Sequence, residues 1–261
     1  MVQIDVLLEG QRFKSRQGVV GYCSVLLFEG RQRTLFDVGH VGRRVVLLDA
    51  LEQRGLTPAE IDTVVLSHAH WDHAQNLDLF DQSSILMHPD ERRYARAPHR
   101  NDWATPAWTG AMLSNEDPRI VEVDEGYELE PGIRVLHTPG HSVGSIALAI
   151  DTDAGISVIT GDVLHYATAA LTGRNPIVFW NDEQASASIK RLVELGDVVY
   201  PGHDRPFRVT SSGEIEYLRP YELTILNVEQ DDPGFAIERT GPADWIMPGI
   251  EEQRLPPLPG E

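Results

Sequence analysis

An α/β fold, with two sheets packed face to face and helices on the outside, is predicted for this chain of 261 residues. Three observations favour it. Short apolar or β-branched segments, many of them bounded by glycines, alternate with segments of helical periodicity along most of the sequence. Strands lead in each half of the chain, with helices interspersed among them. No internal repeat or linker divides the sequence, so we expect a single domain spanning residues 1–261.

The first half of the chain predicts five strands and three helices. The strands are expected where short apolar segments occur, at residues 2–8, 22–28, 33–38, 63–67 and 84–88. The apolar spacing within residues 41–54 predicts a helix, and Gly55 is its expected cap. Further helices are expected at residues 74–80 and 89–96.

The second half continues the alternation, with strands expected at residues 134–138, 145–150, 156–160 and 197–200 and a helix at residues 182–195. Residues 90–118 interrupt it, because they hold Trp103, Trp108, prolines and charges with little periodicity. We expect a substrate-covering insertion there, with an ordinary surface loop as the alternative. The proline-rich stretch 232–261 is expected to wrap irregularly against the domain.

The net charge of −18, from 40 acidic and 22 basic residues, repels polyanions at long range. Because no basic stripe accompanies it, a nucleic-acid substrate is not expected. Two bound divalent cations would make the mouth of an active site less negative than the rest of the surface. Because the net charge disfavours nucleic acid, the expected partner is a small-molecule substrate. A homo-oligomer is one option for the assembly.

The single cysteine, Cys23, lies in an apolar segment and is expected as a small core side chain. One cysteine forms no internal disulfide, which favours a reducing cytoplasmic location. The N-terminus shows no secretory signal, and no apolar stretch is long enough for a membrane span.

The most informative segment places four metal-ligand residue types within six positions, namely His68, His70, Asp72 and His73. Histidines at positions i and i+2 of an extended chain point to the same side, so His68 and His70 can bind one ion together. Asp72 and His73 follow where we expect the strand to turn into a loop, so they can face a second ion. Imidazole and carboxylate are ligands that zinc, iron or manganese accept.

Three fragments downstream each place a histidine or aspartate beside a glycine directly after an apolar strand, at His141, Asp162 and His203. The glycines allow a sharp turn that brings the ligand in close. A lone histidine is usually a structural residue, but seven ligand-type residues in this arrangement predict a site for two divalent metal ions, with zinc first and iron, manganese or cobalt as alternatives.

The chain resembles the metallo-β-lactamase-fold hydrolase superfamily, whose signature is HxHxDH followed by separate His, Asp and His ligands. The resemblance spans roughly residues 20 to 210 and implies a four-layer αββα sandwich. It also implies that His68, His70 and His141 hold the first metal, that Asp72, His73 and His203 hold the second, and that Asp162 bridges both. Asp37 matches an acidic residue that orients the metal ligands in that superfamily.

Such a site makes hydroxide available near neutral pH and polarises a carbonyl or phosphoryl group for hydrolysis. Asp72 is a catalytic candidate that orients the attacking water or shuttles its proton, and a purely ligating role is the alternative. His165 and Tyr166 are the other catalytic candidates. In the lactonases of this superfamily, a tyrosine shortly after the bridging aspartate polarises the lactone carbonyl; here His165 has the expected spacing and Tyr166 comes one position later.

The segment His70-Trp71-Asp72 and the Pro-Gly-His-Asp around His203 are similar to N-acyl homoserine lactonases, so cleavage of a small ester or lactone is expected. Residues 198–209 also resemble short animal metallo-β-lactamase-domain proteins associated with RNA ends, which makes a phosphodiesterase or nuclease-like activity an alternative. A glyoxalase II-like thioesterase is a third option. The non-enzyme alternative is a metal-binding sensor that has no catalytic activity.

Overall fold

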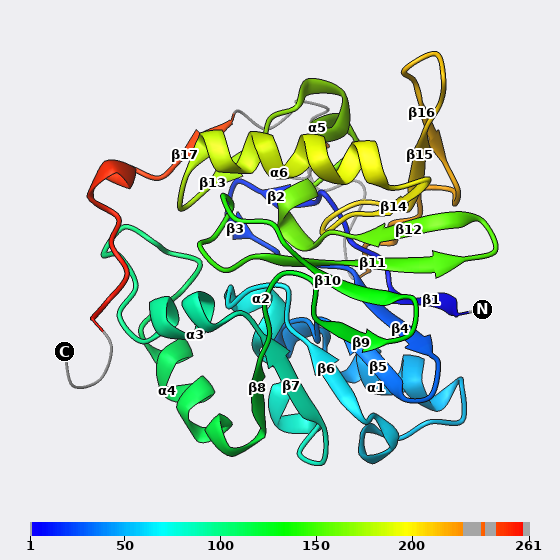
Figure 1. Cartoon of the computed structure of the whole chain (residues 1–261), viewed down its shortest axis with the longest axis horizontal. Coiled ribbons are helices and arrows are strands. Elements are labelled where there is room, and N and C mark those ends of the chain that lie inside the picture. The colour runs from blue at the N-terminus through cyan, green and yellow to red at the C-terminus, as the bar shows by residue number, and fades with distance from the viewer. Residues whose placement is uncertain (1, 227–235, 238–243, 258–261) are drawn as a thin grey trace.

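The computed structural model describes residues 2–226, 236–237 and 244–257. Two mixed sheets lie face to face with helices on the outer side of each, which confirms the predicted αββα sandwich (Figure 1). The first sheet has six strands, in the order β1 (Gln3–Leu8), β4 (Val25–Glu29), β5 (Arg33–Phe36), β6 (Thr63–Val65), β7 (Ser84–Met87) and β8 (Ile120–Glu122).

The second sheet has seven strands, in the order β16 (Ile215–Tyr217), β15 (Phe207–Val209), β14 (Val198–Tyr200), β12 (Gly155–Ile159), β11 (Ile146–Thr152), β10 (Ile133–His137) and β9 (Glu128–Glu130). Two short pairs complete the strands, namely β2 (Lys14–Ser15) with β3 (Gly18–Val19), and β13 (Ile177–Val178) with β17 (Trp245–Ile246).

The α-helices are α1 (Arg44–Glu52), α2 (Trp71–Ala74), α3 (Pro89–Ala95), α4 (Trp108–Asn115), α5 (Ala167–Thr172) and α6 (Asp182–Leu195). Short 3₁₀ turns are η1 (Val41–Arg43), η2 (Pro58–Glu60), η3 (Leu77–Leu79), η4 (Asp117–Arg119), η5 (Gly161–Leu164) and η6 (Ile250–Glu252). Figure 1 shows α6 running along the outer side of the second sheet and α1, α3 and α4 on the side of the first.

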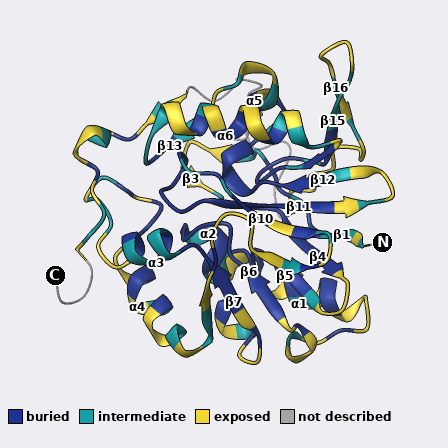
Figure 2. Cartoon of the chain, in the orientation of Figure 1, coloured by how far each residue is buried: buried dark blue, intermediate teal, exposed yellow. Residues whose placement is uncertain are grey.

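Period-two alternation along the strands builds the layers, and β11 shows it clearly. Ile146, Leu148 and Ile150 pack in the apolar cluster between the sheets. The intervening Ala147 and Ala149 face the other way, into the cluster that includes the buried side of α6. Both faces of the central strands are therefore covered, and Figure 2 shows buried residues concentrated in the central strands of both sheets.

The helix predicted at residues 74–80 was placed wrongly. Helix α2 begins at Trp71 and ends at Ala74, and a 3₁₀ turn follows, so Asp72 and His73 lie in a short helix rather than in a loop. The buried Asn76 explains the interruption, because its amide donates to the carbonyl oxygens of Val38 and His40 at 3.0 and 2.8 Å. Those bonds hold the chain against the neighbouring loop instead of extending the helix.

The two segments without clear periodicity contain more regular structure than the sequence indicated. Residues 90–118 include α4, which buries Thr109 and Leu113. In the predicted C-terminal wrap, Trp245–Ile246 forms β17, which pairs in parallel with β13, while residues 232–235, 238–243 and 258–261 lie outside the described residues.

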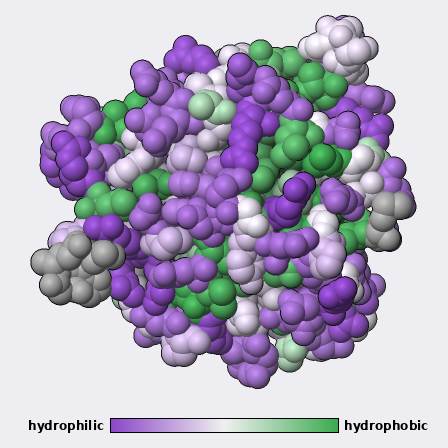
Figure 3. All heavy atoms as spheres, viewed as in Figure 1, coloured by the Kyte–Doolittle hydropathy of each residue, from purple (hydrophilic) through white to green (hydrophobic). Residues whose placement is uncertain are grey.

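The face seen in Figure 3 is mostly hydrophilic, with smaller apolar patches between the charged side chains. Among the residues that the structure describes, no helix combines the length and the apolar character needed to cross a membrane.

Candidate metal centre

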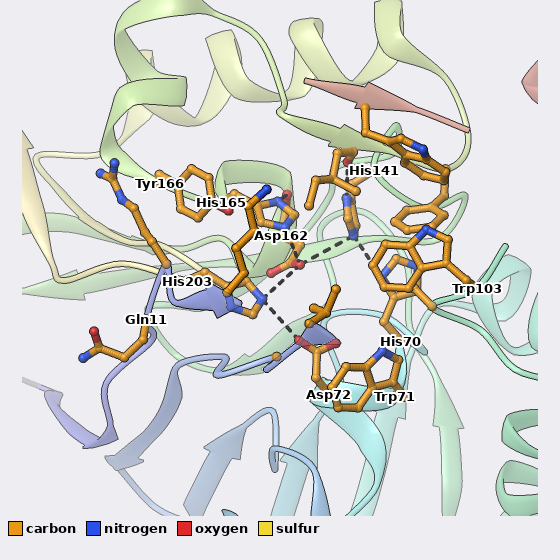
Figure 4. A pocket seen from close by; sticks show the side chains of 18 of the residues that line it. Gln11, His70, Trp71, Asp72, Trp103, His141, Asp162, His165, Tyr166 and His203 are labelled. Carbon is orange, nitrogen blue, oxygen red and sulfur yellow. Dashed lines mark hydrogen bonds and ion pairs between the residues drawn. The ribbon is translucent and has the colours of Figure 1, made fainter. Parts of the chain in front are cut away.

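The predicted metal ligands follow the carboxyl ends of four strands. His68 follows β6, His141 follows β10, Asp162 lies in η5 directly after β12, and His203 follows β14. Within the second sheet, β10 and β12 each pair antiparallel with β11, and β14 pairs parallel with β12. These three strands therefore run in one direction, and their ligands gather at one edge of the sheet, opposite the end of β6 (Figure 4).

The structure brings all seven predicted ligands into two adjoining groups. The first group holds His68, His70, His141 and Asp162, whose ligand atoms lie within 4.8 Å of one another. All four residues are buried, and His70 Nδ1 lies 3.0 Å from His141 Nε2. Three imidazoles and one carboxylate are a donor set that suits zinc and related transition metals.

The second group holds Asp72, His73 and His203, which are also buried. Asp162 lies between the two groups. Its Oδ1 is 3.2 Å from His73 Nε2, and its Oδ2 is 3.3 Å from His203 Nε2 and 3.6 Å from His141 Nε2. This carboxylate therefore faces both groups, as a bridging ligand must.

Orphaned buried atoms at this place test whether the residues fit a metal pair. Within the described part of the chain, His68 Nε2, His73 Nε2 and Asp162 Oδ1 are buried and have no hydrogen-bond partner. Leaving such atoms unsatisfied costs about 1–3 kcal/mol each. Bound cations would satisfy them, so the donor set fits two divalent ions.

Hydrogen bonds on the far side of the imidazoles fix which nitrogen faces the site. His141 Nδ1 donates to the carbonyl oxygen of Ile177 at 2.7 Å, and His203 Nδ1 donates to that of Tyr22 at 3.0 Å. In the neutral form of each ring, the unprotonated Nε2 therefore points to the metal groups, in the tautomer that a metal ligand needs.

Asp37 orients the second group. Its Oδ2 lies 2.7 Å from His73 Nδ1, and its two oxygens accept from the backbone N–H and the hydroxyl of Ser67, each at 2.8 Å. Asp37 is the non-glycine residue with positive φ, at 59°, among those described. A left-handed backbone is uncommon for such a residue, and it occurs here where the side chain reaches a metal ligand.

A close approach explains the glycine of the last ligand motif. A Cβ on Gly202 would lie 2.1 Å from Asp162 Oδ1 and 2.8 Å from the carbonyl oxygen of Gly161. Only a residue without a side chain allows the loop that carries His203 to reach the bridging carboxylate.

The two groups differ in how readily they take up protons. Burial lowers the pKa of His68 and of His70 well below the usual value, so both rings are neutral. Burial also lowers the pKa of His73 and of His203, but nearby carboxylates, led by Asp162, outweigh it and raise both pKa values. A metal must therefore displace protons from the second group but not from these two rings of the first.

We expect acidification to empty the second group before the first. Below a raised pKa, each proton that a metal must displace weakens its binding by about tenfold per pH unit. Metal content after dialysis at steps from pH 8 to pH 5 checks this, with about one ion per chain retained at an intermediate pH. Loss of both ions in a single step would contradict it.

A cavity of about 370 Å³ opens onto the metal groups. His165 and Tyr166 line it, together with Asp72 and His70 (Figure 4). His165 Nδ1 donates to the carbonyl oxygen of Asp162 at 2.8 Å, and its Nε2 lies 3.0 Å from Asp162 Oδ2. The ring of Tyr166 instead lies under the guanidinium of Arg12, 4.8 Å from the ring centroid, and burial raises the pKa of Tyr166 to about 12.

Comparison with known proteins identifies the family. The model of the Metallo-beta-lactamase superfamily matches residues 18–203, which is more than half of the chain. The chain belongs to the metallo-β-lactamase superfamily. Together with the buried His/Asp groups, membership makes it a metal-dependent hydrolase of this fold.

Two curated members of the superfamily are similar to the chain. "Metallo-beta-lactamase domain-containing protein 1" of Xenopus laevis is 28% identical over 193 residues, which cover 74% of this chain and 75% of that protein. An "N-acyl homoserine lactonase" of Bacillus cereus is 31% identical over 163 residues, or 60% of this chain. The match spans 62% of that lactonase, a little under two thirds of its length.

A solved structure, described as "AidC, a Dizinc Quorum-Quenching Lactonase" with a bound product, has a TM-score of 0.61 to this chain. It is 19% identical, and the match covers 77% of this chain and 80% of that one. At this identity the likeness is one of fold.

Sequence reasoning missed several residues that support the site. Asp204 is buried and accepts from the backbone N–H of Ala167 at 3.0 Å and from the guanidinium of Arg12. Phe179, which follows β13, and Trp245, which lies in β17, also line the cavity. The position of Asp204 next to His203 could have marked it as a supporting residue. No local sequence pattern indicated that the two aromatic residues line the site.

Proposed function

We propose that the chain hydrolyses the ester bond of a small lactone of the N-acyl homoserine lactone type. The apolar cavity wall beside the first metal group carries this proposal. Phe179 packs against His70 with ring centroids 4.6 Å apart, and it contacts Trp103 at 5.3 Å and Trp245 at 5.0 Å. With Trp71 they form a surface that suits an apolar acyl group next to the reacting carbonyl.

The names of the relatives support the same proposal. The Bacillus cereus relative is named an N-acyl homoserine lactonase, and the structural relative is described as a dizinc lactonase. We propose zinc as the metal at both groups on the strength of that description and of the nitrogen-rich donor set.

When two divalent cations are bound, they supply a water of lowered pKa and a Lewis acid for the carbonyl oxygen. Asp72 lines the cavity with its Oδ2 3.4 Å from His203 Nε2, so it is placed to accept the proton of the attacking water. His165 presents Nε2 beside the bridging carboxylate, and we assign it the role of holding the substrate carbonyl or the leaving oxygen. Tyr166 stacks with Arg12 and lines the rim beside it.

A phosphodiester or a glutathione thioester would require cationic side chains for its anionic groups. Among the described residues that line the cavity, Arg12 and Lys14 are the fixed cations. Arg12 is already paired with Asp204, with Nε 3.0 Å from Oδ2, and Lys14 is exposed in β2. The shortage of available cations in the described lining of the cavity therefore favours a neutral substrate.

A hydrolysis panel tests the proposal with the zinc-loaded chain and its metal-free form as control. It contains acyl homoserine lactones of several chain lengths, simple lactones, thioesters, phosphodiesters and β-lactams. We expect the kcat/KM for ring opening of acyl homoserine lactones to be about tenfold or more above the kcat/KM for any other class. The reason is that the acyl group packs against the aromatic side chains of the cavity wall. A preference for a phosphodiester or thioester would overturn the substrate assignment, and two bound ions without any hydrolysis would favour a sensor.

A further inference from the structure

Glu91, on α3, is a buried carboxylate that the proposed chemistry does not use. Its side chain is fully buried, at 0% exposure. Among the described residues, no arginine or lysine pairs with it, and it accepts hydrogen bonds from three donors in two loops. A buried carboxylate without a cationic partner persists when its hydrogen bonds satisfy it.

The three donors belong to the loops that carry the first metal group. Glu91 Oε1 accepts from the backbone N–H of Ala69 at 2.9 Å, and Ala69 lies between His68 and His70. Glu91 Oε2 accepts from the hydroxyl of Ser142 and from the backbone N–H of Gly144, each at 2.8 Å.

Ser142 directly follows His141, so one carboxylate joins the two loops that supply all three histidines of the first group. The packing at this place is tight, because a Cβ on Gly144 would lie 2.5 Å from the backbone nitrogen of Glu91. Helix α3 therefore holds the His141 loop through backbone contact as well as through the carboxylate. Glu91 therefore ties the two loops together through contacts that do not involve the ligand side chains.

Asp37 makes the corresponding contacts for the second group, where its carboxylate joins Ser67 to His73. We propose that Glu91 is the positioning residue of the first metal site, so that each metal site has its own buried carboxylate. This inference rests on the metal-dependent function proposed above but not on the choice of substrate. Glu91 touches no ligand side chain in the described contacts and acts through the backbone on either side of the histidines.

Glu91→Gln tests the proposal with little change in volume. A glutamine amide has one acceptor oxygen, so its NH₂ must face either the N–H of Ala69 or that of Gly144, and one loop loses its bond. We expect the affinity of the first site for Zn²⁺ to fall about 10- to 100-fold, while the second site keeps its affinity. The readouts are Zn²⁺ content in buffers of fixed free Zn²⁺ and anomalous diffraction, which shows which group keeps its ion.

Glu130→Gln is the matched control. Glu130 is also a buried carboxylate that accepts two backbone N–H groups, those of Arg31 and Gln32 at 2.6 and 2.9 Å. Those residues form the β4–β5 turn, at the opposite end of β5 from Asp37. This variant is expected to bind both ions as the unmodified chain does.

Equal weakening of the two sites in Glu91→Gln, or no weakening of either, would overturn the positioning role. If that variant does not fold, Ser142→Ala removes one of the three bonds and is expected to weaken the first site alone by a smaller factor; unchanged affinity would then overturn the proposal. Failure of the lactonase proposal is distinguishable, because ions would bind with the same site selectivity while the hydrolysis panel stayed negative.

Discussion

Asp162→Asn is expected to empty both metal groups and to reduce hydrolysis by a factor on the order of 10²–10³, since a catalytic metal contributes several kcal/mol to transition-state stabilisation. Among the described residues, Asp162 is the carboxylate that faces both groups, with its Oδ2 3.6 Å from His141 Nε2 of the first group and its Oδ1 3.2 Å from His73 Nε2 of the second. Asparagine replaces one oxygen by an NH₂ group, which does not bind a cation. Metal content and kcat/KM on the same preparation check the expectation.

Asp102→Asn separates this effect from the general cost of changing a buried carboxylate. Asp102 is buried and accepts from the backbone N–H groups of Ala104 and Thr105 at 2.9 and 2.8 Å, but it belongs to neither metal group. We expect that variant to lose stability and to retain both ions. If Asp162→Asn also retained both ions and full activity, Asp162 would not be a bridging ligand.

Removal of the metals with a chelator is expected to abolish hydrolysis reversibly and to lower the melting temperature. Ions held at a free concentration of about 100 times their Kd stabilise the folded chain by about 2.7 kcal/mol per site. For a domain of this size, each kcal/mol shifts Tm by roughly 2–4 °C, so a fall of about 5–10 °C per site is expected.

Elemental analysis should give close to two transition-metal ions per chain before chelation, and addition of Zn²⁺ should restore both activity and Tm. Treatment with Mg²⁺ is the matched control, because the imidazole-rich groups are poor ligands for a hard cation. An enzyme that stayed active after all bound metal had been removed would contradict the mechanism.

Much of the metal centre could be predicted because its ligands lie at strand ends beside glycines. The pattern His68, His70, Asp72 and His73 is local, so it can be read without knowing the fold. The later ligands His141, Asp162 and His203 could be added because each stands beside a glycine directly after an apolar strand. Two sheets face to face with helices outside were predicted from the alternation of short apolar segments with segments of helical periodicity, and the structure has this arrangement.

Apart from Asp37, the supporting residues could not be predicted, because their roles depend on tertiary contacts. Glu91 lies in the charged run Asp90-Glu91-Arg92-Arg93, which has the composition of an exposed helix surface. It is buried where α3 packs on the loop after His141. Helix α2 was misplaced for the same reason, since the side chain of Asn76, not local propensity, determines where that helix ends.

The ligands are divided between the two layers of strands, with His68 to His73 contributed by the first and His141, Asp162 and His203 by the second. Neither half carries a complete donor set, so the metal centre forms only when the two layers are packed together. A shift of one layer past the other would therefore separate the ligands of the first half from those of the second. Hydrolysis by this chain therefore depends on the correct placement of its two halves against each other.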